Sequence, residues 1–423
     1  MAKRRGIYYG WVVLVVGVII MTTIYGIRNT FGVFFPSILE HFGWTRASTA
    51  LMLSIAILVY GFVAPLAGSL GDRLNPRRVM AVSLVALSLV TVSCGLASEL
   101  WQFYLIYGVL APVFSAFAGW PIFVPVLSRW FTKKRGLVMG LGQMGVALSF
   151  TYGMFAQVVI AGVGWQRAYF VLAGILLVVA LPLCLLFYYR PGETRHRVER
   201  AEPAAAPDIT SPDWTLRRAL RVPQLWFLVV SQFFFWGLGG YLLVAHQVKF
   251  AEDVGFSSAF AAGVFALYGL FMVGGFLGSI FSDWISREGI ITIATALGIG
   301  AVIALLMTVD TSRPWLLYAY AAGMGLGMGL YAPTTTAAMT DIFHGRHLGA
   351  IAALLLTGMG LGAAIGPWLG GYIFDATGSY RLAFLLCIAS FALSSLAFWL
   401  AAPRKADKLR ARVLAAYPKN RAA

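Results

Sequence analysis

Charged residues are scarce in this sequence. Asp, Glu, Lys and Arg together make up 11% of the 423 residues, against about 25% in an average soluble domain. Hydrophobic residues make up 60%. This balance excludes a soluble globular chain and predicts a protein that crosses a membrane several times. The formal net charge of +16 could suit a nucleic-acid partner, but the positions of the basic residues give a different explanation.

Cysteine is also rare, and each of the three cysteines lies inside an apolar run: Cys94, Cys184 and Cys387. Such positions argue against disulfides and against a metal cluster. The five histidines are dispersed, and no nucleophile stands in a recognisable catalytic motif. The sequence therefore predicts no metal, no cofactor and no enzymatic activity, and a membrane-bound enzyme or sensor is the least favoured class.

Twelve apolar segments are long enough to cross a bilayer, which takes about 20 residues in a helix. The predicted fold is an all-α polytopic membrane protein with both termini on one side. The segments run over 9–35, 47–70, 79–97, 101–127, 137–163, 168–189, 225–248, 259–281, 290–309, 315–339, 348–374 and 382–401.

The basic residues follow these segments in a strongly uneven way. The side opposite the termini holds only Arg46, Arg167, Lys249, Arg313 and Arg381. All other Lys and Arg except Arg28 lie on the side of the termini. Lys and Arg are enriched in cytoplasmic loops, so we expect both termini in the cytoplasm. The short tails favour a bacterial protein.

Arg28 is the exception, because it lies well inside the first apolar segment. A charge at the centre of a bilayer costs about 2.5 to 3.5 kcal/mol on insertion scales. The spans contain no mid-membrane Asp or Glu that could pair with it. An anionic substrate is our leading explanation. The alternative is an arginine bonded to backbone carbonyls and to Asn29 or Tyr25.

The two halves of the sequence repeat each other. RWFTKKRG at Arg129 corresponds to DIFHGRHLG at Asp341, and GWQRAYF at Gly164 corresponds to GSYRLAF at Gly378, with nearly equal separations. Two such halves are typical of alternating-access transporters. We expect two pseudo-symmetric six-helix bundles, over 1–189 and 223–402. A basic cytoplasmic linker (190–222) joins them, and a basic cytoplasmic tail (403–423) follows.

One loop motif carries a family resemblance. GSLGDRLNPRR, which contains Asp72, Arg73 and Arg77, resembles the loop signature of the major facilitator superfamily, and SIFSDWISRE with Asp283 is its weaker copy. A carboxylate at a helix end can pair with arginines or with a neighbouring helix N-terminus. These four residues are therefore predicted to close the cytoplasmic side. The alternative is that they only set the topology.

Further motifs resemble one branch of that superfamily, the monocarboxylate and oxalate/formate transporters: YGW, FGVFFP, FGWTRAS, SRWFTKKRG and AHQVKFAEDVG. The resemblance implies a facilitator for small organic anions, often coupled to protons, in the cytoplasmic (inner) membrane. Two cationic positions of these relatives are lost here, where Gly275 and Leu355 stand. This departure favours a monoanion held by Arg28 alone over a dicarboxylate.

Helical spacing groups the residues that we expect to bind substrate. Tyr25, Arg28 and Asn29 belong to the first span. Trp236 and His246 share a polar stripe of the seventh span with Gln232, to which we assign no role. His246 is the candidate for proton coupling, because histidine ordinarily titrates near pH 6.5, although it could equally be a plain interfacial side chain. The remaining candidates, each as easily a packing residue, are Trp120, Tyr152, Tyr268 and Tyr331.

These observations predict a secondary transporter that moves a small organic anion, a monocarboxylate, by alternating access. Protons or a counter-anion are the candidate coupling partners. We expect a monomer in the lipid bilayer that binds no nucleic acid. The alternative is a multidrug or organic-cation exporter of the same fold, but such an exporter would need a membrane-embedded carboxylate, and the spans contain none.

Overall fold

The computed structural model describes residues 8–131, 135–187, 214–343 and 348–405. Within these ranges the chain is helical and contains no strand, as predicted. The bounds are α1 (Tyr9–Asn29), α2 (Phe31–Phe42), α3 (Arg46–Arg73), α4 (Pro76–Leu96), α5 (Leu100–Phe103), η1 (Tyr104–Leu110), α6 (Ala111–Ala118), α7 (Trp120–Trp130), α8 (Arg135–Leu148), η2 (Ser149–Thr151), α9 (Tyr152–Val163), α10 (Trp165–Ile175), η3 (Leu176–Ala180), α11 (Leu181–Phe187), α12 (Leu216–Ala219), α13 (Pro223–Gln232), η4 (Phe233–Gly240), α14 (Tyr241–Val254), α15 (Ser258–Gly278), η5 (Ser279–Asp283), α16 (Arg287–Met307), α17 (Trp315–Ile342), α18 (Leu348–Thr377), α19 (Arg381–Ala401) and η6 (Pro403–Lys405).

Eleven helical stretches of the described chain are long and apolar enough to cross a membrane. The twelfth predicted span is α17, which has 28 residues and so has the length. Its glycines and tyrosines lower its mean hydropathy. The twelve-helix arrangement predicted from the sequence is confirmed in this way.

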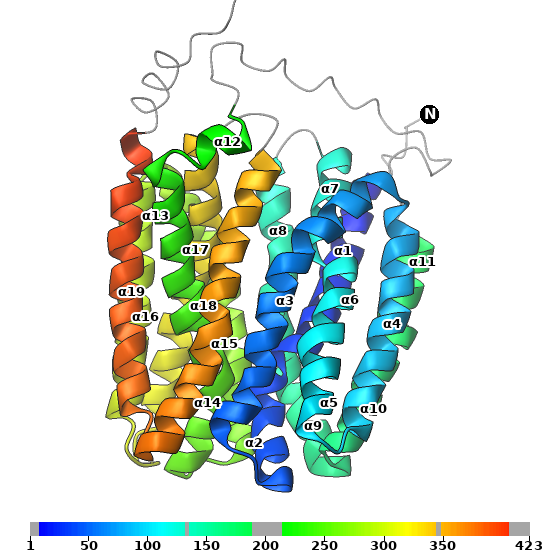
Figure 1. Cartoon of the computed structure of the whole chain (residues 1–423), viewed down its shortest axis with the longest axis vertical. Coiled ribbons are helices and arrows are strands. Elements are labelled where there is room, and N and C mark those ends of the chain that lie inside the picture. Colours follow the sequence, from blue (N-terminus) through cyan, green and yellow to red (C-terminus); the bar gives the residue numbers. More distant parts are fainter. Residues whose placement is uncertain (1–7, 132–134, 188–213, 344–347, 406–423) are drawn as a thin grey trace, which may run out of the picture.

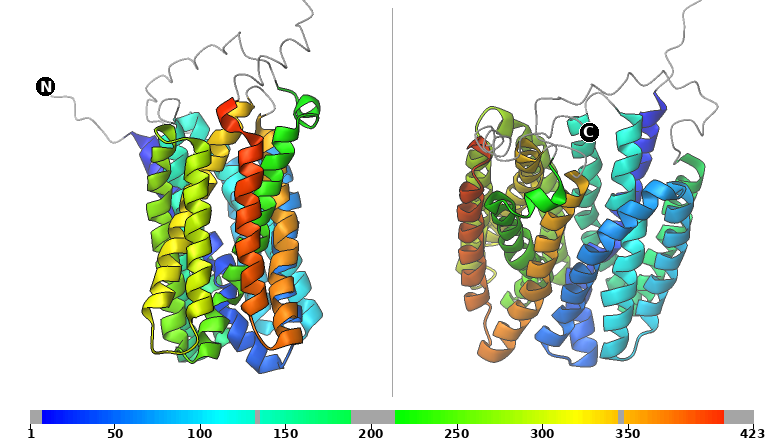
Figure 2. Two further views of the ribbon diagram at one scale, coloured as in Figure 1. Left: turned by 90° about the vertical axis from the view of Figure 1, so that its left-hand side faces the viewer. Right: turned by 45° about the horizontal axis from the view of Figure 1, so that its top comes forward.

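The helices form two groups that stand side by side (Figure 1). Helices α1–α11 form one group, the N-terminal half, and α13–α19 form the other, the C-terminal half. Two further directions of view show the same arrangement (Figure 2). We call the end where α1 begins and α19 ends the termini side, and the end with the α2–α3 connection the far side. The predicted linker lies mostly outside the described residues, and its last part is packed rather than free: Trp214 is 1% exposed and contacts Phe343.

The internal repeat is visible in the turns of the far side. Four glycines have a positive φ and end or begin helices there: Gly43, Gly164, Gly255 and Gly378. Residues other than glycine rarely adopt this backbone conformation. Gly43 follows α2 and Gly255 follows α14, while Gly164 and Gly378 belong to the motif pair found in the sequence. The halves therefore share turn geometry as well as sequence.

Glycine also allows the two halves to approach closely. A Cβ added at Gly371 of α18 would lie 2.6 Å from the backbone of Arg46 and Ala47 at the start of α3. One added at Gly32 of α2 would lie 2.6 Å from the carbonyl oxygen of Val244 in α14. Helices α3 and α18 thus pack against each other across the interface between the halves.

Candidate functional site

A cavity of about 200 Å³ lies between the two halves. Its walls come from helices of both groups. It is lined by Tyr25, Arg28, Tyr60, Trp120, Gln143, Val146, Gln232, Trp236, Tyr241, Met272, Phe276, Ala332, Thr336, Leu356 and Met359. The lining is aromatic and aliphatic with a few polar groups, as is usual for sites that bind small molecules.

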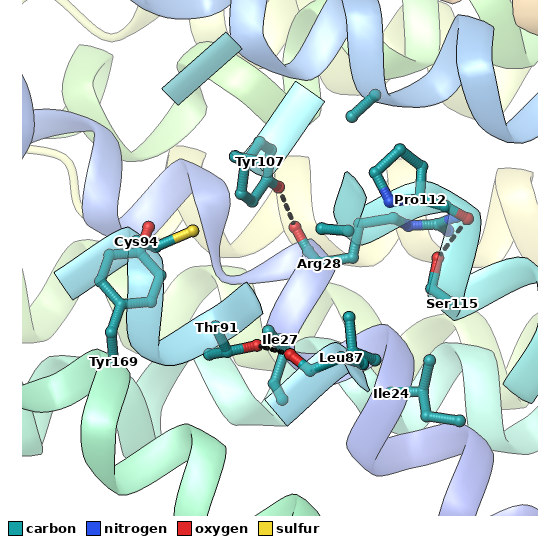
Figure 3. Close-up of a pocket in the computed structure, with 12 residues that line it drawn as sticks. Ile24, Ile27, Arg28, Leu87, Thr91, Cys94, Tyr107, Pro112, Ser115 and Tyr169 are labelled. Carbon is teal, nitrogen blue, oxygen red and sulfur yellow. Dashed lines mark hydrogen bonds between the residues drawn. The ribbon is translucent and has the colours of Figure 1, made fainter. Parts of the chain in front are cut away.

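Arg28 lines this cavity from the last turn of α1. Thr30 separates α1 from α2 but has a helical conformation and donates its N–H to the carbonyl oxygen of Gly26, and Pro36 inside α2 lacks a backbone donor. The hydroxyl of Tyr107 donates a 2.8 Å hydrogen bond to the carbonyl oxygen of Arg28 (Figure 3). The backbone that carries the arginine is therefore fixed by a neighbouring helix.

The guanidinium of Arg28 is surrounded by phenols. Its Nη2 is 3.5 Å from the hydroxyl of Tyr241, the only described residue of the C-terminal half that it bonds. Its central carbon lies 4.6 Å from the ring centre of Tyr25 and 5.1 Å from that of Tyr60. Such contacts stabilise a cation by the negative face of the ring. The Nε atom is buried without a hydrogen-bond partner among the described residues.

Tyr25 is itself held by two further groups. Its hydroxyl is 2.8 Å from the hydroxyl of Tyr60 and accepts a 3.2 Å hydrogen bond from the backbone N–H of Trp120. That N–H is free because Trp120 is the first residue of α7, and the first N–H groups of a helix have no partner within it. The break between α6 and α7 at Gly119 thus supplies a donor inside the membrane.

Charge in the cavity is of one sign. Among the described residues of the lining, Arg28 is the only charged side chain, and no described Asp or Glu is paired with it. Position 275 has no room for a long side chain, since a Cβ added to Gly275 would lie 2.5 Å from the carbonyl oxygen of Leu326. Leu355 is 4% exposed. The relatives carry cationic residues where this chain has Gly275 and Leu355. No other described cation of the lining takes their place.

A second, smaller cavity of about 20 Å³ lies inside the N-terminal half (Figure 3). Arg28 lines this one too, together with the side chains of Thr91, Cys94, Ser115 and Tyr169. The volume is enough for about one water molecule. Thr91 and Ser115 already donate to backbone carbonyls, so the small cavity offers little for a larger ligand.

Four of the predicted substrate-binding residues line the central cavity: Tyr25, Arg28, Trp120 and Trp236. The structure places the other five in packing contacts outside the lining. The Nδ2 of Asn29 donates a 2.8 Å hydrogen bond to the hydroxyl of Ser149, and the hydroxyl of Tyr152 is 3.1 Å from that of Thr23. Tyr268 packs edge-on against Phe150, and Tyr331 stacks on Phe235.

The fifth, His246, is fully buried near the far side, where it contacts Tyr380 and Pro367. This depth follows from its place in the seventh span, ten residues after Trp236. In η4 the chain makes wider turns than an α-helix, so the register of the predicted stripe shifts after Trp236. Tyr241 enters the cavity instead of the residues that α-helical spacing selects.

The sequence analysis missed Tyr60, Tyr241 and Gln143 as lining residues, and placed Gln232 on the stripe of the seventh span without assigning it a role. Their signal was weak: each is a single polar group in a long apolar helix. Only the packing of the helices shows which of these polar groups meet. The carboxamide of Gln232 is notable, because its Oε1 is buried and has no hydrogen-bond partner in the described chain.

Of the four predicted gating residues, only Arg77 has a described side chain. The side chains of Asp72, Arg73 and Asp283 lie outside the described residues. Arg77 is half-buried at the start of α4, and its carbonyl oxygen is 3.7 Å from the Cys184 sulfur. The gating role of these residues stays a prediction.

Comparison with known proteins agrees with this architecture. The family model of the Major Facilitator Superfamily matches residues 14–322 and 311–416. Monocarboxylate transporter 11 of Mus musculus is 28% identical over 94% of this chain and 88% of its own length. The oxalate:formate antiporter of Oxalobacter formigenes is 24% identical over 89% of this chain and 90% of its own length.

A solved structure shows the same fold. It is a bacterial homologue of the human lysosomal transporter Spinster, with a TM-score of 0.65 and 18% identity over 97% of this chain and 99% of that one. The family match confirms the resemblance expected from the loop motif, and with it a transporter rather than an enzyme. The chain belongs to the major facilitator superfamily of membrane transporters.

Proposed function

We propose that this transporter moves a small organic monoanion, a monocarboxylate, and that Arg28 binds its carboxylate. The observation that carries the proposal is the cavity of about 200 Å³ with Arg28 as the only charged group of its lining. A guanidinium can donate two parallel hydrogen bonds to a carboxylate. The tyrosines around Arg28 keep it in place without neutralising it, which leaves the charge for the substrate.

Two carboxamides favour a substrate with a second, uncharged polar group. Gln143 lines the cavity from the N-terminal half and Gln232 from the C-terminal half. The unpartnered Oε1 of Gln232 can accept a hydrogen bond from such a group. A dicarboxylate would leave one carboxylate without a cation, and an organic cation would meet Arg28 without any acid to offset it.

Two relatives support this choice, since one is a monocarboxylate transporter and the other an oxalate:formate antiporter. The distribution of Lys and Arg supports cytoplasmic termini, so that the far side faces outward. We propose that the bundles of residues 1–189 and 223–402 move as two bodies about the cavity in a monomer in the cytoplasmic membrane.

The test is transport by purified protein in liposomes. Radiolabelled monocarboxylates of graded length are compared with dicarboxylates and with organic amines. We expect uptake of the monocarboxylates, near-complete loss in Arg28→Ala, and strong loss in Arg28→Lys, because an ammonium lacks the planar fork of a guanidinium. Arg313→Ala, in an exposed far-side loop, is the matched control. Uptake of amines by the wild type, or full activity of Arg28→Ala, would refute the proposal.

A further inference from the structure

A cluster of charged residues joins the two halves at the far side. Arg46, the first residue of α3, forms an ion pair with Asp253 of α14. Its guanidinium also donates a 2.8 Å hydrogen bond to the hydroxyl of Tyr380 and lies 3.5 Å from the ring centre of Phe374. One side chain of the N-terminal half thus contacts three residues of the C-terminal half.

Asp375 strengthens the same contact through the backbone. Its two carboxylate oxygens accept hydrogen bonds from the N–H groups of Arg46, at 3.1 Å, and Ala47, at 2.8 Å. These donors belong to the first turn of α3, where helical N–H groups lack partners within the helix and favour an anion. We call Arg46, Asp253, Asp375 and Tyr380 the far-side clasp.

Lys249 adds two weaker contacts beside the clasp. Its ammonium is 3.5 Å from the carboxylate of Glu40 in α2 and 3.3 Å from that of Asp253. Glu40 belongs to the N-terminal half, so this pair also spans the interface. The clasp must separate whenever the cavity opens toward the far side, as alternating access requires.

His246 lies directly beneath the clasp and is fully buried. Its Nε2 is 2.8 Å from the carbonyl oxygen of Pro367, and its Nδ1 is 3.1 Å from the hydroxyl of Tyr380. A carbonyl can only accept, so Nε2 carries the proton. Nδ1 of a neutral ring then accepts, and the Tyr380 hydroxyl donates to it while accepting from Arg46.

This chain of hydrogen bonds is complete only when His246 is neutral. A second ring proton would turn Nδ1 into a donor aimed at the oxygen that already accepts from Arg46. Two cations would then share one phenol oxygen in a buried site. The ring of Phe35 in α2 lies nearly perpendicular to the imidazole, with the ring centres 5.3 Å apart, and offers no oxygen acceptor.

The acids that face this site are already engaged. Asp375 accepts from the two N–H groups of α3, and Asp253 is paired with Arg46 and Lys249. Glu40 is 70% exposed and contacts Lys249. In the described part of the chain, none of these acids hydrogen-bonds the histidine or forms an ion pair with it.

We propose that His246 is the pH-sensitive lock of the far-side clasp. The neutral imidazole holds Tyr380 for Arg46 and keeps the far side closed, and a proton on Nδ1 favours the open clasp, where water can solvate the charge. The inference needs alternating access but not the substrate proposed above, so its test contains no substrate.

The test measures opening directly in purified protein. Spin labels are attached to Ser98→Cys and Thr311→Cys, two exposed positions on far-side loops of opposite halves. The native cysteines are buried and will react little. Pulsed electron paramagnetic resonance then gives the distribution of distances between pH 8 and pH 5.5. We expect the open fraction to rise as the pH falls, with the open-to-closed ratio changing at most about tenfold per pH unit for one proton.

His246→Gln should abolish this dependence. Tyr380→Phe keeps the ring but removes the hydroxyl that bonds both Arg46 and His246. This variant should open the clasp at every pH. His41→Gln, which alters an exposed far-side histidine, is the matched control and should retain the wild-type response. Thermal unfolding of each variant checks that it is folded.

Three results would overturn the proposal. The first is a distance distribution of the wild type that does not change with pH. The second is an unchanged pH response in folded His246→Gln, and the third is a response lost in His41→Gln instead. The clasp would then be a permanent contact or would be controlled by another group.

Discussion

The hydroxyl groups of Tyr25 and Tyr60 lie 2.8 Å apart, and both rings lie beside the guanidinium of Arg28. The two tyrosines come from different helices, α1 and α3, and both belong to the N-terminal half. These two contacts of the arginine therefore lie within the N-terminal half. A substrate bound to Arg28 would therefore stay with the N-terminal half while the halves separate.

Tyr60→Phe tests this arrangement. The ring remains beside Arg28, but the hydroxyl of Tyr25 loses one partner, and a hydrogen bond of this kind contributes about 1 kcal/mol. We expect substrate affinity in liposome uptake to fall roughly fivefold. Tyr152→Phe is the control, because the structure places Tyr152 outside the cavity lining although the sequence predicted it as a binding residue. Equal effects of the two variants would contradict the placement.

Gln232→Leu tests the second polar contact of the substrate. Leucine has a similar size but cannot hydrogen-bond, so monocarboxylates with a hydroxyl or amide group should lose affinity relative to unsubstituted ones. The loss of one hydrogen bond predicts a relative change of about three- to tenfold. Gln224→Leu is the control, since Gln224 lies in the same helix, also has a buried unpartnered Oε1, and does not line the cavity. A uniform loss for all substrates would indicate a structural effect.

Gly371→Ala tests the close approach of α18 to α3. The added methyl group would lie 2.6 Å from the backbone of Arg46 and Ala47, so the far side could close only with a shift of one helix. Overpacking of this kind typically costs about 1–3 kcal/mol. The label pair at residues 98 and 311 should report a larger open fraction. Gly263→Ala, where nothing lies within 4 Å, should leave the distances unchanged and controls for helix propensity.

Asp72→Asn tests the predicted gate on the termini side. Neutralising the carboxylate should weaken closure there, and a cysteine introduced in the cavity, Thr336→Cys, should react faster with a thiol reagent added from that side. Asp310→Asn, in an exposed far-side loop, is the control. An unchanged reaction rate would leave Asp72 with a role in topology alone.

The sequence by itself determined the class of the protein and the place of its charge. Apolar runs of about 20 residues indicate membrane spans. An arginine inside such a run needs a group that offsets the cost of its charge, whatever the helices pack against. The motif pairs at Arg129 and Gly164 indicated two related halves. The turns at Gly43 and Gly255 then extended the repeat in the structure, where both have a positive φ.

The tertiary structure alone decided which polar groups meet. Tyr60 and Tyr241 are distant in sequence from Arg28 and meet it at the central cavity, which residues of α1, α3 and α14 line together. The π-helical turns of η4 shifted the register that periodicity assumed, so that Tyr241 lines the cavity. His246 lies farther along the same span, beneath Arg46 and Tyr380. Helical periodicity describes one helix at a time, whereas a binding site and a clasp depend on contacts between helices far apart in the chain.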